Sequence, residues 1–175
     1  MCTFIDEDAF RFSNFSGSLS LPVCTAVGGY AFDNSKFTGN FYAPKCKLLE
    51  TQAFYSSKFS GELNLPACTV VGHNAFTNSN FSGSLNLPVC TMVGDYAFRN
   101  SNFSGELYIP NCVYIYQNAF LNSNFTQITI GANARFENNC IGAHSAEFIN
   151  DYAANGKLAG TYVWDSNTQH WIYQN

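Results

Sequence analysis

Hydrophobic and polar positions along this chain repeat with a period of 22 residues, as the near-identical stretches 61–82 and 83–104 show. Alanine-phenylalanine pairs return at one phase of the repeat, with the phenylalanines at Phe10, Phe32, Phe54, Phe76, Phe98 and Phe120. A second column holds Phe15, Phe37, Phe59, Phe81, Phe103 and Phe125. A fixed period between about 20 and 50 residues is typical of solenoids, propellers and other repeat arrays. The pattern therefore predicts an elongated stack of coils around a continuous apolar core.

Each repeat predicts two short strands and a turn. Leu63 and Leu65 alternate with polar residues, which is the period of a half-buried strand, and the proline that follows ends it. The β-branched segment 69–71 predicts the second strand. Its last residue belongs to an apolar column that we expect to point inward: Ile5, Val27, Leu49, Val71, Val93 and Ile115. We expect the Ala-Phe pair to lie on one helical turn and the Asn-Ser-Asn run at 78–80 to form a turn.

The composition of the chain changes after residue 130, and we expect the tail to cover the last coil. Within the tail, the pattern predicts a short helix that Ser145 is able to cap and Gly156 is able to end. Two β-rich runs, 160–164 and 170–173, predict a hairpin. The predicted organisation is thus a solenoid over residues 1–130 and a capping segment over residues 131–175.

The N-terminal end is expected to be the weak point of the stack. Residues 2–10 align with residues 24–32, so the chain starts in the middle of a repeat, and no signal peptide precedes it. Either upstream sequence has been removed or the natural chain lacks an N-terminal cap. An uncapped solenoid end exposes apolar residues and an unpaired strand edge. We therefore predict weak self-association through this end.

Charge and hydropathy argue against a nucleic-acid partner and against a transmembrane helix. The net charge is −4, charged residues make up only 11% of the chain, and no run of Lys or Arg occurs. Binding to nucleic acid needs a basic patch that neutralises phosphates, so we expect no nucleic-acid partner. A transmembrane helix needs about 20 consecutive apolar residues, and no run approaches that length.

The cysteines recur with the repeat. Six of the seven stand at one phase, at Cys2, Cys24, Cys46, Cys68, Cys90 and Cys112. On successive coils their side chains would point the same way, which is awkward for a disulfide. Metal ligands must converge on one point, whereas these cysteines are strung along an axis. We predict reduced, buried core thiols, which leave the redox compartment open.

The unit LNLP-x-C-T-x-V-G-x-x-AF resembles the BspA-like leucine-rich repeat, in which a strand I-x-I-P is followed by V-T-x-I-G-x-x-A-F. Cys68 and Cys90 stand where that family often has Val. The resemblance covers residues 2–130, and the tail residues 160–162 with Trp171 are similar to the ending of such bacterial proteins. It implies a leucine-rich repeat solenoid, a right-handed β/α superhelix with a parallel sheet on its concave side. It also implies a bacterial or protist protein, secreted or at the cell surface, that acts in adhesion, with no catalytic residue and no cofactor.

The sequence offers little for catalysis. His73, His144 and His170 share no spacing typical of a metal site or of a catalytic triad. Glu62 and Glu106 stand two repeats apart on one predicted flat face, at about 9 to 10 Å by strand spacing. A glycan-processing enzyme needs two carboxylates on opposite sides of a bond. Nothing in the sequence places these two across a cleft, so we predict that the protein is not an enzyme.

The candidate site is the outward face of the first strand of each repeat, because solenoids commonly bind partners on such a broad surface. One outward column holds Ser18, Asn40, Glu62, Ser84 and Glu106, and the next holds Ser20, Tyr42, Asn64, Asn86 and Tyr108. Tyr, Asn and Glu are suited to bind a glycan or a peptide, so the predicted site is Glu62, Glu106, Tyr42, Asn64, Asn86 and Tyr108. We predict a cell-surface or secreted adhesion module whose partner is a protein or glycan of a host or neighbouring cell. The alternative is a structural spacer that displays another domain and has no ligand of its own.

Overall fold

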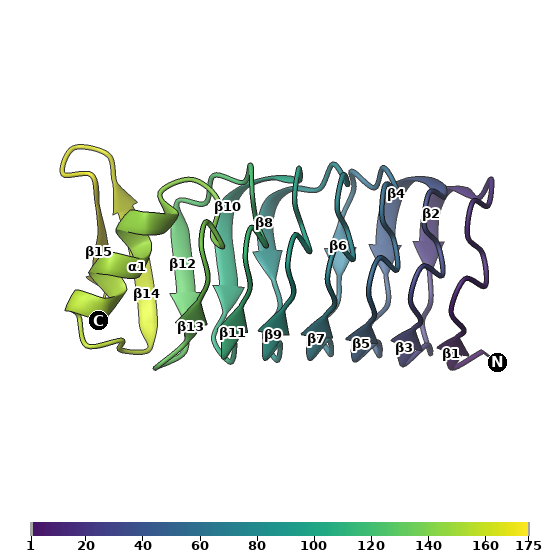
Figure 1. Cartoon of the computed structure of the whole chain (residues 1–175), viewed down its shortest axis with the longest axis horizontal. Coiled ribbons are helices and arrows are strands. Elements are labelled where there is room, and N and C mark those ends of the chain that lie inside the picture. Colours follow the sequence, from purple (N-terminus) through teal and green to yellow (C-terminus); the bar gives the residue numbers. More distant parts are fainter. Residues whose placement is uncertain (1, 175) are drawn as a thin grey trace.

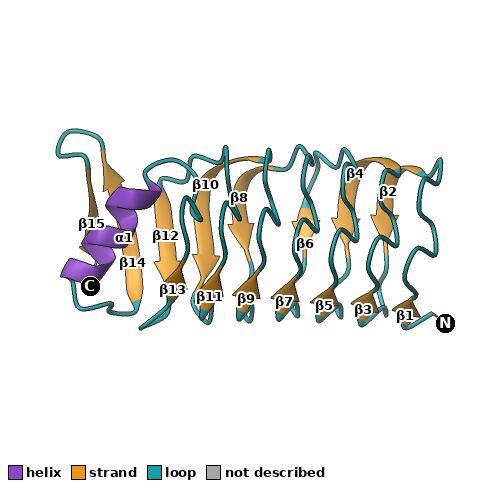
Figure 2. Ribbon diagram, viewed as in Figure 1, coloured by secondary structure: helices purple, strands orange, loops and turns teal. Residues whose placement is uncertain are grey.

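The computed structural model describes residues 2–174 and shows a β-solenoid whose coils follow one another in a row (Figure 1). Parallel sheets run along the stack, and a single helix lies at the C-terminal end (Figure 2). The predicted leucine-rich repeat solenoid is confirmed.

A seven-stranded parallel sheet forms one side of the stack. Its two-residue strands follow in chain order: β1 (Phe4–Ile5), β3 (Ala26–Val27), β5 (Leu48–Leu49), β7 (Val70–Val71), β9 (Met92–Val93), β11 (Tyr114–Ile115) and β13 (Arg135–Phe136). The second strand predicted for each repeat is therefore confirmed. The apolar column that ends these strands is buried, as predicted, with at most 6% exposure at Ile5. Threonine hydroxyls reinforce the sheet, since Thr69 and Thr91 each donate to a carbonyl one coil back.

The other side carries the leucine strands, and its parallel pairing is interrupted. A three-stranded sheet holds β2 (Ser16–Ser20), β4 (Lys36–Tyr42) and β6 (Leu63–Asn64). A five-stranded sheet holds β8 (Ser82–Asn86), β10 (Asn102–Ile109), β12 (Gln127–Ile130), β14 (Gly160–Asp165) and β15 (His170–Gln174). Strands β6 and β8 belong to neighbouring coils but to different sheets. The strands themselves are as predicted, whereas the interruption is not.

The third side of the stack consists of non-helical turns. The prediction that the Ala-Phe pair lies on one helical turn was therefore wrong. The N–H of Phe76 donates to Ala97 O of the next coil (2.7 Å), while the N–H of Ala75 donates to Gly72 O within its own coil (3.2 Å). Every second N–H thus points to the neighbouring coil, which is incompatible with the i→i−4 bonds of a helix. Left-handed residues such as Asn74 (φ 56°) and Asn78 (φ 66°) allow this alternation.

The asparagines that begin the predicted Asn-Ser-Asn turns form a ladder along the stack. Asn100 Nδ2 donates to Asn78 Oδ1, and Asn122 Nδ2 donates to Asn100 Oδ1, each at 2.7 Å. All three residues have left-handed backbones. We call Asn78, Asn100 and Asn122 the asparagine ladder.

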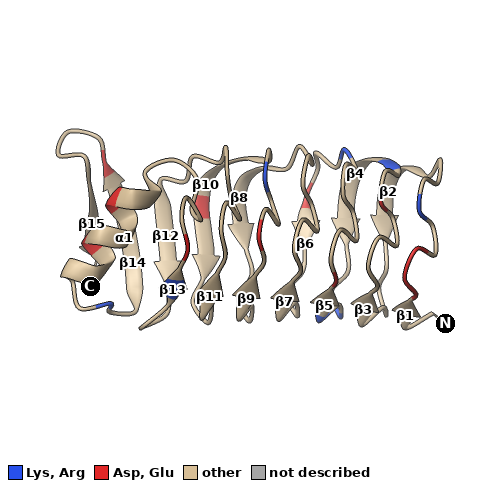
Figure 3. Ribbon diagram, in the orientation of Figure 1, with Lys and Arg blue, Asp and Glu red and all other residues tan. Residues whose placement is uncertain are grey.

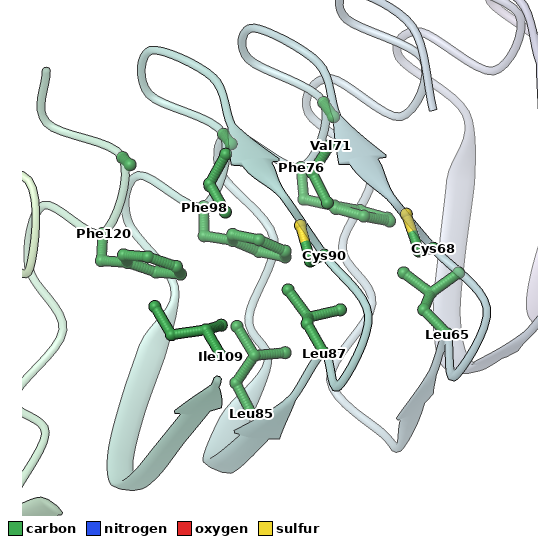
Figure 4. Packing of buried hydrophobic residues seen from close by; sticks show 14 of the residues in the cluster. Leu65, Cys68, Val71, Phe76, Leu85, Leu87, Cys90, Phe98, Ile109 and Phe120 are labelled. Atoms are coloured by element: carbon green, nitrogen blue, oxygen red, sulfur yellow. The ribbon is translucent and has the colours of Figure 1, made fainter. Parts of the chain in front are cut away.

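Phenylalanines stack through the core (Figure 4). The ring of Phe76 lies parallel to Phe54 at 5.3 Å and to Phe98 at 5.4 Å. Phe81, from the second column, meets Phe76 edge to face at 5.5 Å. Offset-stacked and edge-to-face contacts are the favoured aromatic geometries. The two columns therefore form one continuous core, and the deeply buried Phe76 lies near its middle.

The tail builds the predicted helix and hairpin. Helix α1 (Ser145–Ala154) packs Phe148 and Tyr152 edge to face against Phe136 of β13, and Trp171 of β15 contacts Phe148. Strand β14 pairs antiparallel with β12, and β15 pairs with β14. These contacts cover the end of the core. The division at residue 130 stays a prediction, because β13 continues the seven-stranded sheet beyond it.

Of the two predicted ends of helix α1, the C-terminal end was correct and the N-terminal cap was not. Ser145 was expected to cap the N-terminus, and this was wrong. His144, with φ 57°, occupies that place and makes no side-chain cap, while Ser145 Oγ accepts the N–H of Ile141 (3.2 Å). Gly156 ends the helix as predicted: its φ is 68°, and the N–H of Lys157 returns to Tyr152 O (2.9 Å). This is a Schellman ending.

The cysteine column is buried and free. Cys24, Cys46, Cys68, Cys90, Cys112 and also Cys140 are buried, and none of them is in a disulfide; Cys2 is exposed. Figure 4 shows Cys68 and Cys90 at the same place on successive coils. Burial raises the pKa of the Cys46 thiol to about 12 and that of Cys140 to about 12. The predicted burial is confirmed for Cys24, Cys46, Cys68, Cys90 and Cys112 but is wrong for Cys2, and all of these cysteines are free in this structure.

We expect one of the seven cysteines, Cys2, to react with a thiol reagent in the native protein. The nucleophile is the thiolate, and burial keeps the reagent away from the other six cysteines. Burial also raises the pKa of the Cys24, Cys46, Cys68 and Cys140 thiols, which disfavours their thiolates. The remaining thiols should react only after denaturant is added, as a timed thiol titration would show. An intact mass that differs by pairs of hydrogens between reduced and untreated samples would contradict this.

Apolar side chains lie open at the N-terminal end. Phe10, Phe12 and Phe15 are 40%, 65% and 48% exposed, although Phe10 and Phe15 belong to core columns. Together with Ile5, Leu19 and other residues, Phe10 and Phe15 line a hollow of about 440 Å³. The opposite end is covered by the tail, so the two ends differ as predicted.

In the chain of residues 1–175, hydrogen exchange is therefore expected to be fastest in residues 2–20 and slower in the central coils, since Phe10, Phe12 and Phe15 of the first coil are exposed. We also expect weak, concentration-dependent self-association in sedimentation experiments. Replacing Phe12 with serine should reduce it, whereas Ile172→Ser at the other end should not. Uniform protection, together with a strictly monomeric chain at high concentration, would contradict both expectations.

Candidate functional site

The predicted site residues all lie on the outward side of the leucine strands. Tyr42 and Tyr108 are 44% and 37% exposed. Glu62, Asn64 and Asn86 are exposed as well, and Glu106 is half-buried. We call this surface, formed by β4, β6, β8 and β10, the strand face.

The structure sorts these residues into two groups. Tyr42 lies beside Asn64 across the β4–β6 pair, and Tyr108 lies beside Asn86 across the β10–β8 pair. Each group is a tyrosine next to an asparagine. The interruption between β6 and β8 separates the two.

Short polar side chains of the first outward column link successive coils. Ser18 Oγ accepts the N–H of Asn40 (3.0 Å), Asn40 Oδ1 accepts that of Glu62 (2.9 Å), and Ser84 Oγ accepts that of Glu106 (2.9 Å). The glycine before each N–H makes room, since a Cβ on Gly61 would overlap Asn40 Oδ1. Sequence analysis assigned these side chains to solvent and missed this structural role.

The link is missing between Glu62 and Ser84. Among residues 2–174, no side chain accepts the N–H of Ser84. Gly83 has φ 74°, close to the 76° of Gly17, and Gly17 belongs to the first strand of the other sheet. A Cβ on Gly83 would meet nothing within 4 Å. Strand β8 therefore starts a new sheet, and its Gly83 has the same left-handed φ as Gly17 of β2.

A hollow of about 530 Å³ opens where the sheets part. Its polar lining comes from Asn40, Ser60, Glu62, Asn64, Ser82 and Ser84, and Phe81 and Phe103 reach it from the core. The structure thus brings together two predicted site residues, Glu62 and Asn64. The serines were not predicted to take part. One signal in the sequence could have indicated the hollow. Glu62 and Glu106 are the acidic residues at this phase, and of the two only Glu62 precedes a repeat of full length.

Glu106 has a different role. Its Oε1 accepts the hydroxyl of Thr129 (2.9 Å), which in turn contacts the hydroxyl of Thr161 (2.9 Å). It is followed by the shortened repeat, where β12 pairs directly with β10. Strand β8 lies in the coil between Glu62 and Glu106, and both residues lie on the outward side of the leucine strands. They do not form the opposed pair that glycoside hydrolysis needs.

The histidines each have their own partners. His73 Nδ1 lies 2.9 Å from Asp95 Oδ2, and His170 Nδ1 lies 2.9 Å from Asp151 Oδ1. His144 stacks on Trp164. Within residues 2–174, no group of three or more His, Cys, Asp or Glu side chains is arranged to hold a metal ion. Charged residues are sparse along the whole stack (Figure 3).

Comparison with known proteins gives one match. A family model described as a BspA type leucine rich repeat region matches in six copies, over residues 2–104 and 25–147. Comparisons with curated proteins and with solved structures found no match. None of the helices in residues 2–174 has the length and apolar character needed to cross a membrane.

Proposed function

Because the chain belongs to the BspA-type leucine-rich repeat family, we propose that it is a non-enzymatic adhesion module of the cell surface or of a secreted protein. Its ligand docks on the strand face. The family consists of repeat modules that are commonly surface-related and that serve protein interaction. The partner is a surface protein or glycan of a host or neighbouring cell.

The observation that carries this proposal is the hollow between β6 and β8. Most of a solenoid face is flat, and a flat solvated sheet carries polar residues whether or not it binds anything. Ligand sites are usually concave and hold a few placed polar groups that fix the orientation of the ligand. Here Glu62 and Asn64 lie in such a site, and Tyr42 lies beside Asn64 in register.

An array of host surface proteins and glycans tests the proposal. We expect the wild-type chain to bind at least one class of probe. Asn64→Ala should weaken that binding, whereas Lys47→Ala, an exposed residue beside the seven-stranded sheet, should leave it unchanged. If no probe binds, or if the two variants behave alike, the strand face is not the site. The spacer function then becomes the better account of the chain.

A further inference from the structure

The break between β6 and β8 limits what can bind there. We propose that this hollow is a subsite for one or two rings of a neutral, hydroxyl-rich glycan. The proposal rests on the proposed function and chooses glycan over peptide for this site.

The spacing between the two coils excludes a peptide strand inserted between β6 and β8. An extended peptide that paired with both β6 and β8 would need each about 4.8 Å away, so the coils would have to stand twice the usual distance apart. The same two coils touch on other sides, since β7 pairs with β9 and the N–H of Asn80 donates to Phe59 O (2.7 Å). The coils are therefore held at normal spacing. The hollow of about 530 Å³ suits a small ligand, since such sites span about 300 to 1,000 Å³.

The lining favours hydroxyl groups over charged ones. Asn40 Oδ1 already accepts the N–H of Glu62, which leaves the Asn40 amide N–H groups to donate. Glu62 contributes only acceptors when ionised, while Asn64 and Ser82 both donate and accept. The Ser60 hydroxyl already donates to Thr38 O (2.9 Å) and is left to accept, and Ser84 Oγ already accepts the N–H of Glu106 and is left to donate. No lysine or arginine is among the lining residues, so an anionic ligand finds no counter-charge. A sugar hydroxyl also donates and accepts, and this mixture matches it.

The sequence cause of the break supplies a repair variant. At the positions equivalent to Glu62, the short side chains of Ser18 and Ser84 accept an N–H of the next coil. Glu62→Ser places an equivalent hydroxyl where it can accept the N–H of Ser84. We expect β6 and β8 to pair in this variant and the hollow to close. Glu147→Ser is the control, because Glu147 is an exposed glutamate on α1, away from the strand face and the hollow.

The experiment is an NMR titration of ¹⁵N-labelled protein with maltotriose, chitotriose, mannotriose and N-acetyllactosamine. At least one saccharide should shift the amide signals of Gly61, Gly83 and Ser84. Glu62→Ser should weaken that binding at least tenfold, and Glu147→Ser should stay within twofold. Hydrogen exchange at Ser84 should slow in Glu62→Ser without any ligand, which checks the closure independently. Asn64→Ala keeps the break and should also weaken binding at least tenfold.

Three results would overturn the glycan subsite. The first is that no saccharide shifts these amides. The second is that binding is unchanged in both Glu62→Ser and Asn64→Ala. The third is that an extended peptide, but no saccharide, shifts them. Binding to an immobilised surface protein that persists in Glu62→Ser would leave the proposed function standing while the glycan subsite fails.

Discussion

Replacing Phe76 with alanine is expected to lower the free energy of unfolding by about 3 to 5 kcal/mol, the usual cost of removing a large buried aromatic ring. Phe76 is fully buried, stacks on Phe54 and Phe98, and meets Phe81 edge to face. The cavity would lie inside a stack held on both sides, so little relaxation can fill it. Urea denaturation followed by circular dichroism measures the change.

Asn86→Ala is the control for Phe76→Ala. Asn86 lies in the next coil, on the exposed strand face, and its substitution should change stability by less than about 0.5 kcal/mol. Comparable losses from the two variants would mean that the inward and outward positions have been exchanged.

Asn100→Ala is expected to lower the free energy of unfolding by about 2 to 5 kcal/mol. The Asn100 amide makes two hydrogen bonds of 2.7 Å in the asparagine ladder, each contributing about 0.5 to 1.5 kcal/mol. Its backbone, at φ 63°, adds about 1 to 2 kcal/mol of strain for alanine. Denaturant titration of the purified variant gives the total.

Asn100→Gly separates the two causes, because glycine accepts a left-handed backbone. It should lose the hydrogen bonds alone and fall between wild type and Asn100→Ala. If Asn100→Gly is as unstable as Asn100→Ala, the backbone contributes nothing, and if it matches wild type, the ladder contributes nothing.

The sequence predicted the solenoid because a fixed period requires that equivalent residues stack. Val71 and Phe76 could be assigned to the core from their columns alone, and both are buried. The turn at Ala75 and Phe76 was mistaken for a helix because local propensity says nothing of the neighbouring coil. In that turn, every second backbone N–H donates to the neighbouring coil instead of to its own coil. Ser145 was misassigned for a similar reason, since the N–H of Ile141 donates to its hydroxyl oxygen.

The candidate site was predictable only in part. Alternation of polar and apolar residues placed Glu62, Asn64 and the other candidates on the outward side, where they are found. Their grouping depends on whether a side chain reaches the next coil, as Asn40 does to Glu62. That is a contact between repeats, so no property of a single repeat reveals it. Whether the strand face binds a ligand stays a prediction.

The modular contacts of the coils have a consequence for how such a protein grows. Each coil offers its neighbour the same backbone groups, so a duplicated gene segment of one repeat length adds a coil that fits between existing ones. The tail is undisturbed, because it touches only the last coils. Duplication of the unit that carries Glu62, placed before a unit of full length, would create a second break and a second hollow. The number of such hollows then increases by recombination alone, without any new side chain.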